Sequence, residues 1–362
     1  MLIAHLYPKG ARNKMSYFRK NIDSMTPYIP GIQPKDSQVV KLNTNENPFP
    51  PTDKVLKKLT EAVGNNLRRY PDPNCDELRR LIAKTYNVDA QQVIVGNGSD
   101  EVLALIFRAC VDPGDKVLLF YPTYTLYHVM AQASCAKILE HDLDDNFEIP
   151  KNAFLEKYKL SLIPNPNVPS GNFIDKSAIS RLAEDSGGIL VVDEAYADFA
   201  EQNCIDMIKN HDNIIVTRTF SKSFSLAGMR IGFAIASVDI ISGLMKIKDS
   251  YNLNRLSLVA AQAALEDIES VNKNISQIKT IREKYAKILT ELGFDVLSSS
   301  SNFLFVKPPD VLSARELYNG LLDRKILVRF FDNRRVDEYL RITIGTEQEM
   351  SRLLDNIKEL LE

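Results

Sequence analysis

Two segments decide the fold that this sequence predicts: Ile189-Leu-Val-Val-Asp193-Glu-Ala-Tyr196 and, one strand-plus-helix length further on, Ile214-Ile-Val-Thr-Arg-Thr-Phe-Ser-Lys222. Each begins as a short apolar run, which is typical of a buried strand, and ends in polar side chains. Ligands of open α/β sheets bind beyond the carboxyl ends of the strands. We therefore expect Asp193, Tyr196 and Lys222 to lie at one ligand-binding edge.

The chain continues from Lys222 through Ser-Phe-Ser-Leu-Ala-Gly-Met to Arg230, so two strands deliver an amine, a carboxylate, a phenol and a guanidinium to this edge. Pyridoxal 5′-phosphate needs such a set, because its aldehyde takes a lysine, its ring nitrogen a carboxylate and its phosphate several donors. Each residue alone has an ordinary interpretation, with Lys222 as a solvated loop lysine and Asp193 as a helix N-cap. Only the combination predicts the cofactor.

The composition limits the classes of protein that the chain can belong to. Its 362 residues exceed the size at which one hydrophobic core keeps growing, so we expect two domains. A net charge of −2 with scattered basic residues does not indicate a nucleic-acid partner. The four cysteines and four histidines show no metal-ligand spacing, which predicts reduced thiols and no metal site. Because no membrane span or signal-peptide core is evident, we expect a cytoplasmic protein without membrane contact.

Strand and helix signals alternate from about Val93 to Ser237, which predicts a large doubly wound, mixed or parallel α/β sheet. The expected strands are Val93–Val95, Lys116–Phe120, Leu160–Ile163, Ile189–Asp193, Ile214–Thr217 and Arg230–Ser237.

The pattern changes after a helical stretch from about Ser257 to Leu292. Short strands then flank a helix near Ala314–Arg324, and a last helix begins at Gln348, which predicts a smaller α+β domain. These strands are expected at Phe294–Leu297, Phe303–Val306, Ile326–Arg329 and Leu340–Ile344. The predicted organisation is an N-terminal arm over residues 1–41, a large cofactor-binding domain over residues 42–262 and a small C-terminal domain over residues 263–362.

The segment Gly96-Asn-Gly-Ser99-Asp100-Glu101 follows the first expected strand and opens a helix that continues over Val102–Cys110. Its glycines permit a tight turn, and the free N–H groups at the start of the helix favour a phosphate. A dinucleotide-binding fingerprint would need small residues at Asp100-Glu101, so a nicotinamide dehydrogenase is disfavoured. Without a ligand, the segment would be an ordinary helix start. Ser221 and Arg230 are further candidates for binding a phosphate.

Seven segments together carry a resemblance to a known family: Leu42-Asn-Thr-Asn-Glu-Asn-Pro48, Arg69-Tyr-Pro-Asp-Pro73, Gly96-Asn-Gly-Ser-Asp-Glu101, Pro122-Thr-Tyr124, Asp193-Glu-Ala-Tyr196, Ser221-Lys-Ser-Phe-Ser-Leu-Ala-Gly-Met-Arg230 and Leu340-Arg-Ile-Thr-Ile-Gly-Thr346. From about Phe18 to Leu361 the chain resembles the fold-type I, class I/II aminotransferases, and among them the histidinol-phosphate aminotransferase branch. The lysine and aspartate motifs specify the cofactor class, whereas the second and third segments narrow the resemblance to this branch.

The resemblance implies roles for the residues that match the family. Lys222, Asp193 and Tyr196 would be the catalytic residues, at the aldehyde, ring nitrogen and 3′-oxygen of pyridoxal phosphate. The further residues implied to bind the cofactor are Ser99, Asp100, Tyr124, Asn167, Ser221, Arg230 and, from the other subunit of a homodimer, Tyr70, while Asn45, Arg329 and Arg341 are implied to bind the substrate. The homodimer would contain two composite sites.

One segment departs from the family pattern. Aminotransferases of this class present Asn-Pro-Thr-Gly after a proline-rich loop, with the asparagine donating to the cofactor's 3′-oxygen, whereas this chain has Val168-Pro-Ser-Gly171. Either Asn167 reaches the same oxygen through a shifted backbone, or Tyr196 serves alone. Losing one such hydrogen bond would cost about 1 kcal/mol, which a covalently held cofactor tolerates.

The reaction implied by the family is transamination between histidinol phosphate and 2-oxoglutarate, which gives imidazole-acetol phosphate and glutamate and runs in reverse in histidine biosynthesis. Two alternatives stay open. The first is another enzyme of this scaffold, such as an aromatic aminotransferase or a threonine-phosphate decarboxylase, and the second is a non-catalytic cofactor-binding module. The sequence fixes neither the physiological amino acceptor nor the roles of Arg334 and Arg335.

The N-terminal region carries two further expectations. Residues 1–14 precede Met15-Ser-Tyr-Phe-Arg-Lys-Asn21, which resembles a family start, so they are either a disordered extension or the product of an upstream start codon. The proline-bearing stretch Thr26–Pro34 is expected to be an arm that lies over the surface.

Overall fold

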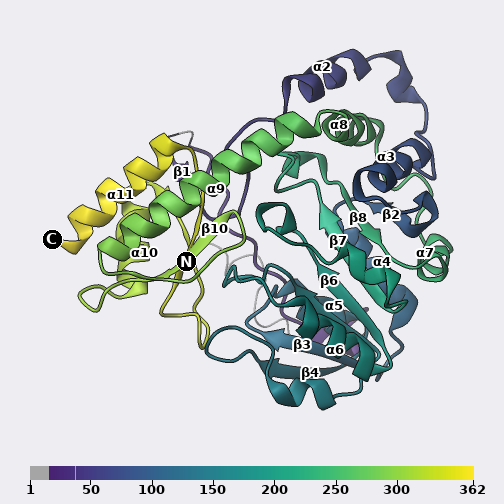
Figure 1. Cartoon of the computed structure of the whole chain (residues 1–362), viewed down its shortest axis with the longest axis horizontal. Helices are drawn as coiled ribbons and strands as arrows, with labels where there is room; N and C mark the ends of the chain where they lie inside the picture. Colours follow the sequence, from purple (N-terminus) through teal and green to yellow (C-terminus); the bar gives the residue numbers. More distant parts are fainter. Residues whose placement is uncertain (1–15, 37) are drawn as a thin grey trace.

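A seven-stranded mixed sheet forms the larger part of the fold (Figure 1). The structure is a computed structural model that describes residues 16–36 and 38–362, so the predicted extension over residues 1–14 lies outside the described residues. The strands of this sheet are β2 (Val93–Gly96), β3 (Lys116–Tyr121), β4 (Lys137–Asp142), β5 (Leu160–Pro164), β6 (Ile189–Asp193), β7 (Ile214–Thr219) and β8 (Gly232–Ile235). Their order is β2-β8-β7-β6-β5-β3-β4. β8 is antiparallel to both of its neighbours, and the other pairs are parallel.

Both faces of this sheet are buried, because its inner strands are apolar at successive positions. In β7, Ile214 and Val216 join an apolar cluster on one face while Ile215 joins a second cluster on the other. The helices that pack on the side of Ile215 are α4 (Ser99–Cys110), α5 (Leu126–Ala133) and α7 (Val238–Met245), and those on the opposite side are α3 (Asp76–Tyr86), α6 (Lys176–Ser186) and α8 (Arg255–Leu265). The predicted doubly wound α/β sheet is therefore confirmed.

A smaller antiparallel sheet lies beyond the long helix α9 (Ile268–Glu291), on the left in Figure 1. Its strands are β9 (Asp295–Val296), β10 (Phe303–Lys307), β12 (Arg329–Phe330) and β13 (Leu340–Thr343), in the order β12-β13-β10-β9. Two helices accompany it, α10 (Ala314–Asp323) and α11 (Glu347–Leu361), and each begins with a capping box.

The N-terminal region is joined to both parts of the molecule. β1 (Val40–Lys41) pairs parallel with β11 (Ile326–Leu327), next to the small sheet. The short helix α1 (Lys20–Ser24) lies near α5, and α2 (Asp53–Ala62) packs on α8. The chain between β1 and α2 therefore crosses from one sheet to the other, which places residues 42–48 between them.

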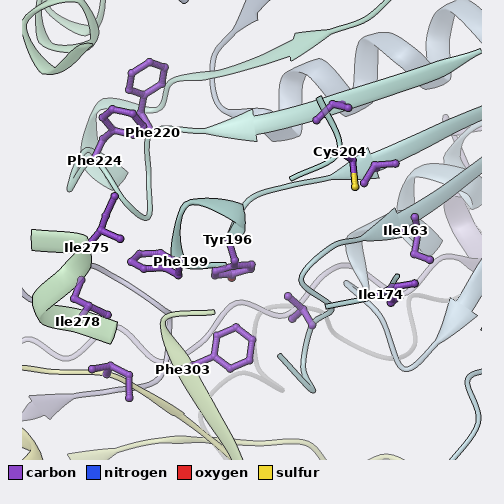
Figure 2. Close-up of a cluster of buried hydrophobic side chains, with 14 of the residues drawn as sticks. Ile163, Ile174, Tyr196, Phe199, Cys204, Phe220, Phe224, Ile275, Ile278 and Phe303 are labelled. Atoms are coloured by element: carbon purple, nitrogen blue, oxygen red, sulfur yellow. The ribbon is translucent and has the colours of Figure 1, made fainter. Parts of the chain in front are cut away.

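An apolar cluster joins the two sheets behind this crossing. Figure 2 shows Ile275 and Ile278 of α9 beside Phe199 and Tyr196 of the segment after β6. The rings of Tyr196 and Phe303, the first residue of β10, meet edge to face with centroids 5.3 Å apart. The segment that carries Tyr196 is therefore held against the small sheet by packing.

Several predicted elements differ from the structure. The helical stretch from Ser257 to Leu292 is divided into α8 and α9, and the strand expected at Ile326–Arg329 changes sheets between β11 and β12. The strand expected from Arg230 begins only at Gly232, because Arg230 itself has a left-handed backbone with φ of 52°. The edge strand β4 was not predicted, since its charged side chains and partly exposed positions give little apolar signal.

Candidate active site

One pocket lies beyond the carboxyl ends of β5, β6 and β7, where the crossing N-terminal segment and the small sheet meet them. The predicted site residues that line it are Lys222, Asp193, Tyr196, Ser99, Asp100, Tyr124, Ser221, Arg230, Asn45, Arg329 and Arg341. Two further predicted residues, Asn167 and Tyr70, do not line it. The fold thus brings together side chains that are up to about three hundred positions apart in the chain, as open α/β sheets do at this edge.

Asp193 ends β6 and is 5% exposed. Its Oδ2 accepts a hydrogen bond of 2.7 Å from the hydroxyl of Tyr127, and its Oδ1 accepts one of 3.2 Å from the N–H of Ala195. Burial raises the pKa of Asp193 to about 6, although the Tyr127 hydrogen bond opposes the rise. None of the largest contributions to this pKa comes from a cation. A cationic group bound beside Asp193 would offset the cost of burying its charge.

Lys222 lies in the loop after β7, with its amine in the pocket. Its Nζ donates to the carbonyl oxygen of Thr44 at 3.1 Å and lies 5.8 Å from the centroid of the Tyr196 ring. The side-chain amide of Asn47 donates to the carbonyl oxygens of Lys222 and Ser223, which fixes the loop. Among the residues that the structure describes, the amine therefore has one neutral acceptor, and from this position it can reach a ligand.

A cup for an anion is built where the start of α4 meets Arg230. The Nη1 of Arg230 donates to Ser221 Oγ at 3.3 Å, and its Nη2 lies 3.2 Å from Asp100 Oδ2. Gly98 precedes the helix with φ of 82°, and a Cβ there would lie 2.6 Å from Arg230 Nη2. The free N–H groups of the first turn of α4, the hydroxyl of Ser221 and the guanidinium thus converge, as binding of a phosphate requires.

Two arginines face the other end of the pocket. Arg329 and Arg341 are partners in the register of β12 and β13. Arg341 donates to the carbonyl oxygen of Asn43 at 3.0 Å, and its buried Nε has no hydrogen-bond partner among the described residues. Burial lowers the pKa of Arg341, and the neighbouring Arg329 adds to that effect. Within residues 16–36 and 38–362 no carboxylate pairs with either guanidinium, so this end of the pocket suits a bound anion.

The segment with Val168 is the one that departs from the family pattern. Val168 lines the pocket, whereas the amide of Asn167 points elsewhere and donates to Ser170 Oγ at 2.7 Å. Asn167 is 1% exposed and its backbone N–H is bonded to Asn172 O. The structure therefore does not bring the Asn167 side chain into the pocket, where it was expected, whereas Tyr196 lines the pocket.

Tyr70 lies outside the pocket of its own chain. Its side chain is 77% exposed and stacks on Tyr251 with ring centroids 4.5 Å apart. A shallow groove beside this pair is also lined by Leu67, Asn97 and Arg255. An exposed aromatic pair of this kind is common where a partner chain binds.

Some pocket residues were missed in the sequence. Tyr127 holds Asp193, and Tyr28 lies edge to face on Tyr124 with centroids 5.6 Å apart. Tyr127 occupies a helix position that is typical of a core residue, and Tyr28 belongs to the arm Thr26–Pro34. The sequence around them therefore did not indicate that either residue lines the pocket. The predicted arm does run over the molecule, since Ile29 O accepts from Arg329 and Ile32 O from Asn43.

The described residues give no support for a metal site or for a membrane-spanning helix. Within residues 16–36 and 38–362, no three side chains of the ligand types His, Cys, Asp and Glu are placed to share a metal ion. Over the same residues, every helix is too short or too polar to cross a bilayer.

A doubly wound sheet whose carboxyl edge holds a lysine, a buried carboxylate and an anion cup defines a fold-type I, pyridoxal-phosphate-dependent transferase. Residues 37–357 match the model of the family described as aminotransferase class I and II. The chain belongs to that family.

Comparison with individual proteins gives the same result. The chain is 44% identical to the histidinol-phosphate aminotransferase of Citrifermentans bemidjiense and 40% identical to histidinol-phosphate aminotransferase 1 of a Nostoc species, covering 96% of this chain and 99% of each relative. Among solved structures, histidinol-phosphate aminotransferase from Sinorhizobium meliloti, in complex with pyridoxal 5′-phosphate, matches with a TM-score of 0.86 at 24% identity over 97% of this chain and 99% of that one. The last comparison bears on the fold alone.

Proposed function

We propose that this chain is a histidinol-phosphate aminotransferase, which exchanges the amino group between histidinol phosphate and 2-oxoglutarate and acts in the reverse direction in histidine biosynthesis. The observation that carries the proposal is the pair Arg329 and Arg341, which face the same pocket as Lys222 and have no carboxylate partner among the described residues. Relatives with this activity in their names are 40% and 44% identical over nearly the whole chain.

The pocket fits pyridoxal 5′-phosphate at both ends of that molecule. A buried carboxylate without a cation, at Asp193, suits a protonated ring nitrogen. The cup beside Gly98, where a Cβ would lie 2.6 Å from Arg230 Nη2, suits the phosphate. Between them, Lys222 supplies an amine for the aldehyde, and Tyr124 supplies a flat face for the ring.

When bound, the cofactor supplies an electron sink for the pair of electrons left on the substrate's α-carbon. The residues of this chain supply the rest. Asp193 would keep the ring nitrogen protonated, and Tyr196 would donate to the 3′-oxygen. The Nζ of Lys222, which lines the pocket, would move the substrate's α-proton.

The phosphate would be held by Ser99, Asp100, Ser221 and Arg230. Asp100 would contribute its backbone N–H at the start of α4 rather than its carboxylate. The carboxylate of Asp100 lies 3.2 Å from Arg230 Nη2. A bound phosphate would compete for that guanidinium.

The arginine pair accounts for two unlike substrates. One pocket must accept the carboxylate of glutamate in one half of the reaction and a phosphorylated imidazole in the other. A guanidinium binds either anion through the same fork of donors. Arg329 and Arg341 would therefore serve both, and Asn45 also lines the pocket.

The proposal includes a cytoplasmic homodimer with composite sites, divided into domains at residues 42–262 and 263–362. Tyr70 supports the dimer, because its side chain is largely exposed and outside its own pocket. We expect it to reach the phosphate cup of a second copy. The four cysteines are all free thiols, which suits a reducing compartment.

The test combines a chemical label with a choice of substrates. Purified protein is incubated with pyridoxal phosphate, reduced with borohydride and digested, and the modified peptide should contain Lys222. Glutamate should then convert the bound cofactor to pyridoxamine phosphate. Histidinol phosphate, phenylalanine and threonine phosphate are compared as amino donors to 2-oxoglutarate. A preference for phenylalanine, or carbon dioxide release from threonine phosphate, would replace the proposed substrate.

A further inference from the structure

Asn45 is bound at all four of its polar groups, although it has a left-handed backbone with φ of 56°. It is 1% exposed. Its N–H donates to Thr343 Oγ1 at 2.9 Å, and its carbonyl oxygen accepts from the amide of Asn302 at 3.1 Å. In the side chain, Oδ1 accepts from Thr343 Oγ1 at 3.0 Å and Nδ2 donates to the hydroxyl oxygen of Tyr196 at 2.8 Å. A side chain held in this way has one orientation.

The hydroxyl of Thr343 decides which way the Asn45 amide faces. Thr343 is 2% exposed, so its hydroxyl proton needs an acceptor inside the protein. Asn45 Oδ1 is the acceptor that the described residues provide. Turning the amide over would leave that proton unpaired, which costs about 1–3 kcal/mol. The amide nitrogen must therefore point at Tyr196.

This orientation determines what the hydroxyl of Tyr196 can do. Because Asn45 Nδ2 is a donor, the oxygen of Tyr196 accepts there and keeps its own proton for another partner. The described residues offer that proton no acceptor, and Tyr196 faces the pocket. The aromatic ring cannot turn away, since Phe303 packs on its face in the cluster of Figure 2. The proton therefore points into the pocket, where a ligand can accept it.

We infer that Asn45 and Thr343 form a relay that sets the hydroxyl of Tyr196 as an obligate hydrogen-bond donor to a negatively charged ligand oxygen. Asn45 is thus a positioning residue rather than a substrate contact. With the proposed function, on which this inference rests, the ligand oxygen is the 3′-oxygen of pyridoxal phosphate. The relay matters more here than with a second donor in place, because Val168 has none to offer.

The relay also links the two ends of the pocket. Thr343 and Arg341 are two residues apart on β13, so their side chains project from the same face of the strand. One strand of the small sheet therefore carries both an arginine that lines the pocket and the hydroxyl that orients the Asn45 amide. A shift of β13 would change both together.

The test is a pH titration of the absorbance of protein loaded with pyridoxal phosphate. A hydrogen bond donated by Tyr196 to the 3′-oxygen makes this oxygen hold less tightly the proton that it shares with the Lys222 nitrogen. Loss of that hydrogen bond should therefore raise the pH at the midpoint of the titration. In Asn45→Asp the hydroxyl would donate to the new carboxylate instead, and we expect a rise of about one pH unit or more. The new charge acts with or without the hydroxyl, so the same change is made in Tyr196→Phe.

The relay predicts a clearly larger shift for Asn45→Asp in the wild type than in Tyr196→Phe. Thr343→Val should raise the midpoint in the same direction, and Thr343→Ser, which keeps the hydroxyl, should restore it. Equal shifts in both backgrounds, or Val and Ser variants that behave alike, would overturn the relay and leave the proposed function standing. A wild-type protein that is not labelled at Lys222 would overturn both.

Discussion

Arg329 lies directly opposite Arg341 in the register of the antiparallel strands β12 and β13. Two guanidinium groups on adjacent strands repel each other, and neither has a carboxylate partner among the described residues. Phe331 lies against both, with its ring centroid 5.3 Å from the Arg329 guanidinium carbon and 5.5 Å from that of Arg341. The arrangement is unfavourable without a ligand, and a bound anion would stabilise it.

The first prediction concerns Arg341→Gln. This variant should lower kcat/KM for glutamate and for histidinol phosphate by about a hundredfold or more, since a charge-assisted fork of hydrogen bonds is lost. The kcat/KM of Arg341→Lys should lie between those of the wild type and Arg341→Gln, because an ammonium group keeps the charge but lacks the fork of donors. Steady-state kinetics with both substrates measure the effect.

The control is Arg352→Gln on the exposed side of α11, where the guanidinium donates to the carbonyl oxygens of Gln38 and Arg324. It should leave both constants unchanged. Inorganic phosphate should also raise the melting temperature of the wild type more than that of Arg341→Gln. Equal kinetic constants for Arg341→Gln and the wild type would remove this residue from the substrate site.

The second prediction follows from the raised pKa of Asp193, about 6 against 3.8 for an exposed aspartate. The folded, cofactor-free protein holds this proton more tightly than the unfolded chain. Ionising the buried Asp193 lowers the stability of the folded protein. This loss of stability is absent below pH 3.8, grows between pH 3.8 and about pH 6, and is complete above about pH 6. Asp193→Asn should therefore stabilise the cofactor-free protein by up to about 3 kcal/mol near pH 8 and by roughly half of that near pH 5.

Urea unfolding of both proteins at the two pH values measures this difference. In the presence of pyridoxal phosphate the order should reverse, because the cationic ring nitrogen loses its partner in the variant. If the cofactor-free Asp193→Asn variant is less stable than the wild type at the higher pH, Tyr127 and the backbone compensate the buried charge fully.

The sequence predicted the inner strands well for a physical reason. Strands buried on both faces, such as β6 and β7, are continuous apolar runs and stand out from their surroundings. The edge strand β4 has Lys137, Glu140 and His141 among its six residues, and periodicity alone does not separate it from a loop. The change of sheet at Val328 depends on pairing with β1, which is nearly three hundred positions away.

The site was predictable where one short segment carries its chemistry, as for Lys222 or Ser99. It was not predictable where long-range packing makes the contact. Thr343 and Asn45 are 298 positions apart, so nothing near either residue indicates their hydrogen bonds. Val168 shows the intermediate case, because the missing amide was visible in the sequence but the direction of Asn167 was not.

The third prediction concerns the anion cup. Gly98→Ala would place a Cβ 2.6 Å from Arg230 Nη2 at a φ of +82°. We expect it to weaken binding of pyridoxal phosphate at least tenfold, since the guanidinium must move.

Gly114→Ala is the matched control, because its φ is +91° but nothing lies within 4 Å of the added atom. Both should lose about 1 kcal/mol of stability from backbone strain, and only the first should lose cofactor affinity. Cofactor titration and thermal melts separate the two effects, and equal cofactor affinity would remove Arg230 from the phosphate site.

The last prediction tests the composite site. If Tyr70 completes the phosphate cup of a second copy, Lys222→Ala has no active site and Tyr70→Ala has two weakened ones. In a mixed dimer, however, Lys222 of the Tyr70→Ala subunit meets the intact Tyr70 of the Lys222→Ala subunit. Unfolding the two variants together and refolding them should therefore restore about a quarter of wild-type activity at low cofactor concentration, because half of the dimers are mixed and each holds one intact site. Variants refolded separately and then combined give the baseline. Activity that never exceeds this baseline would mean that Tyr70 serves its own subunit or no site at all.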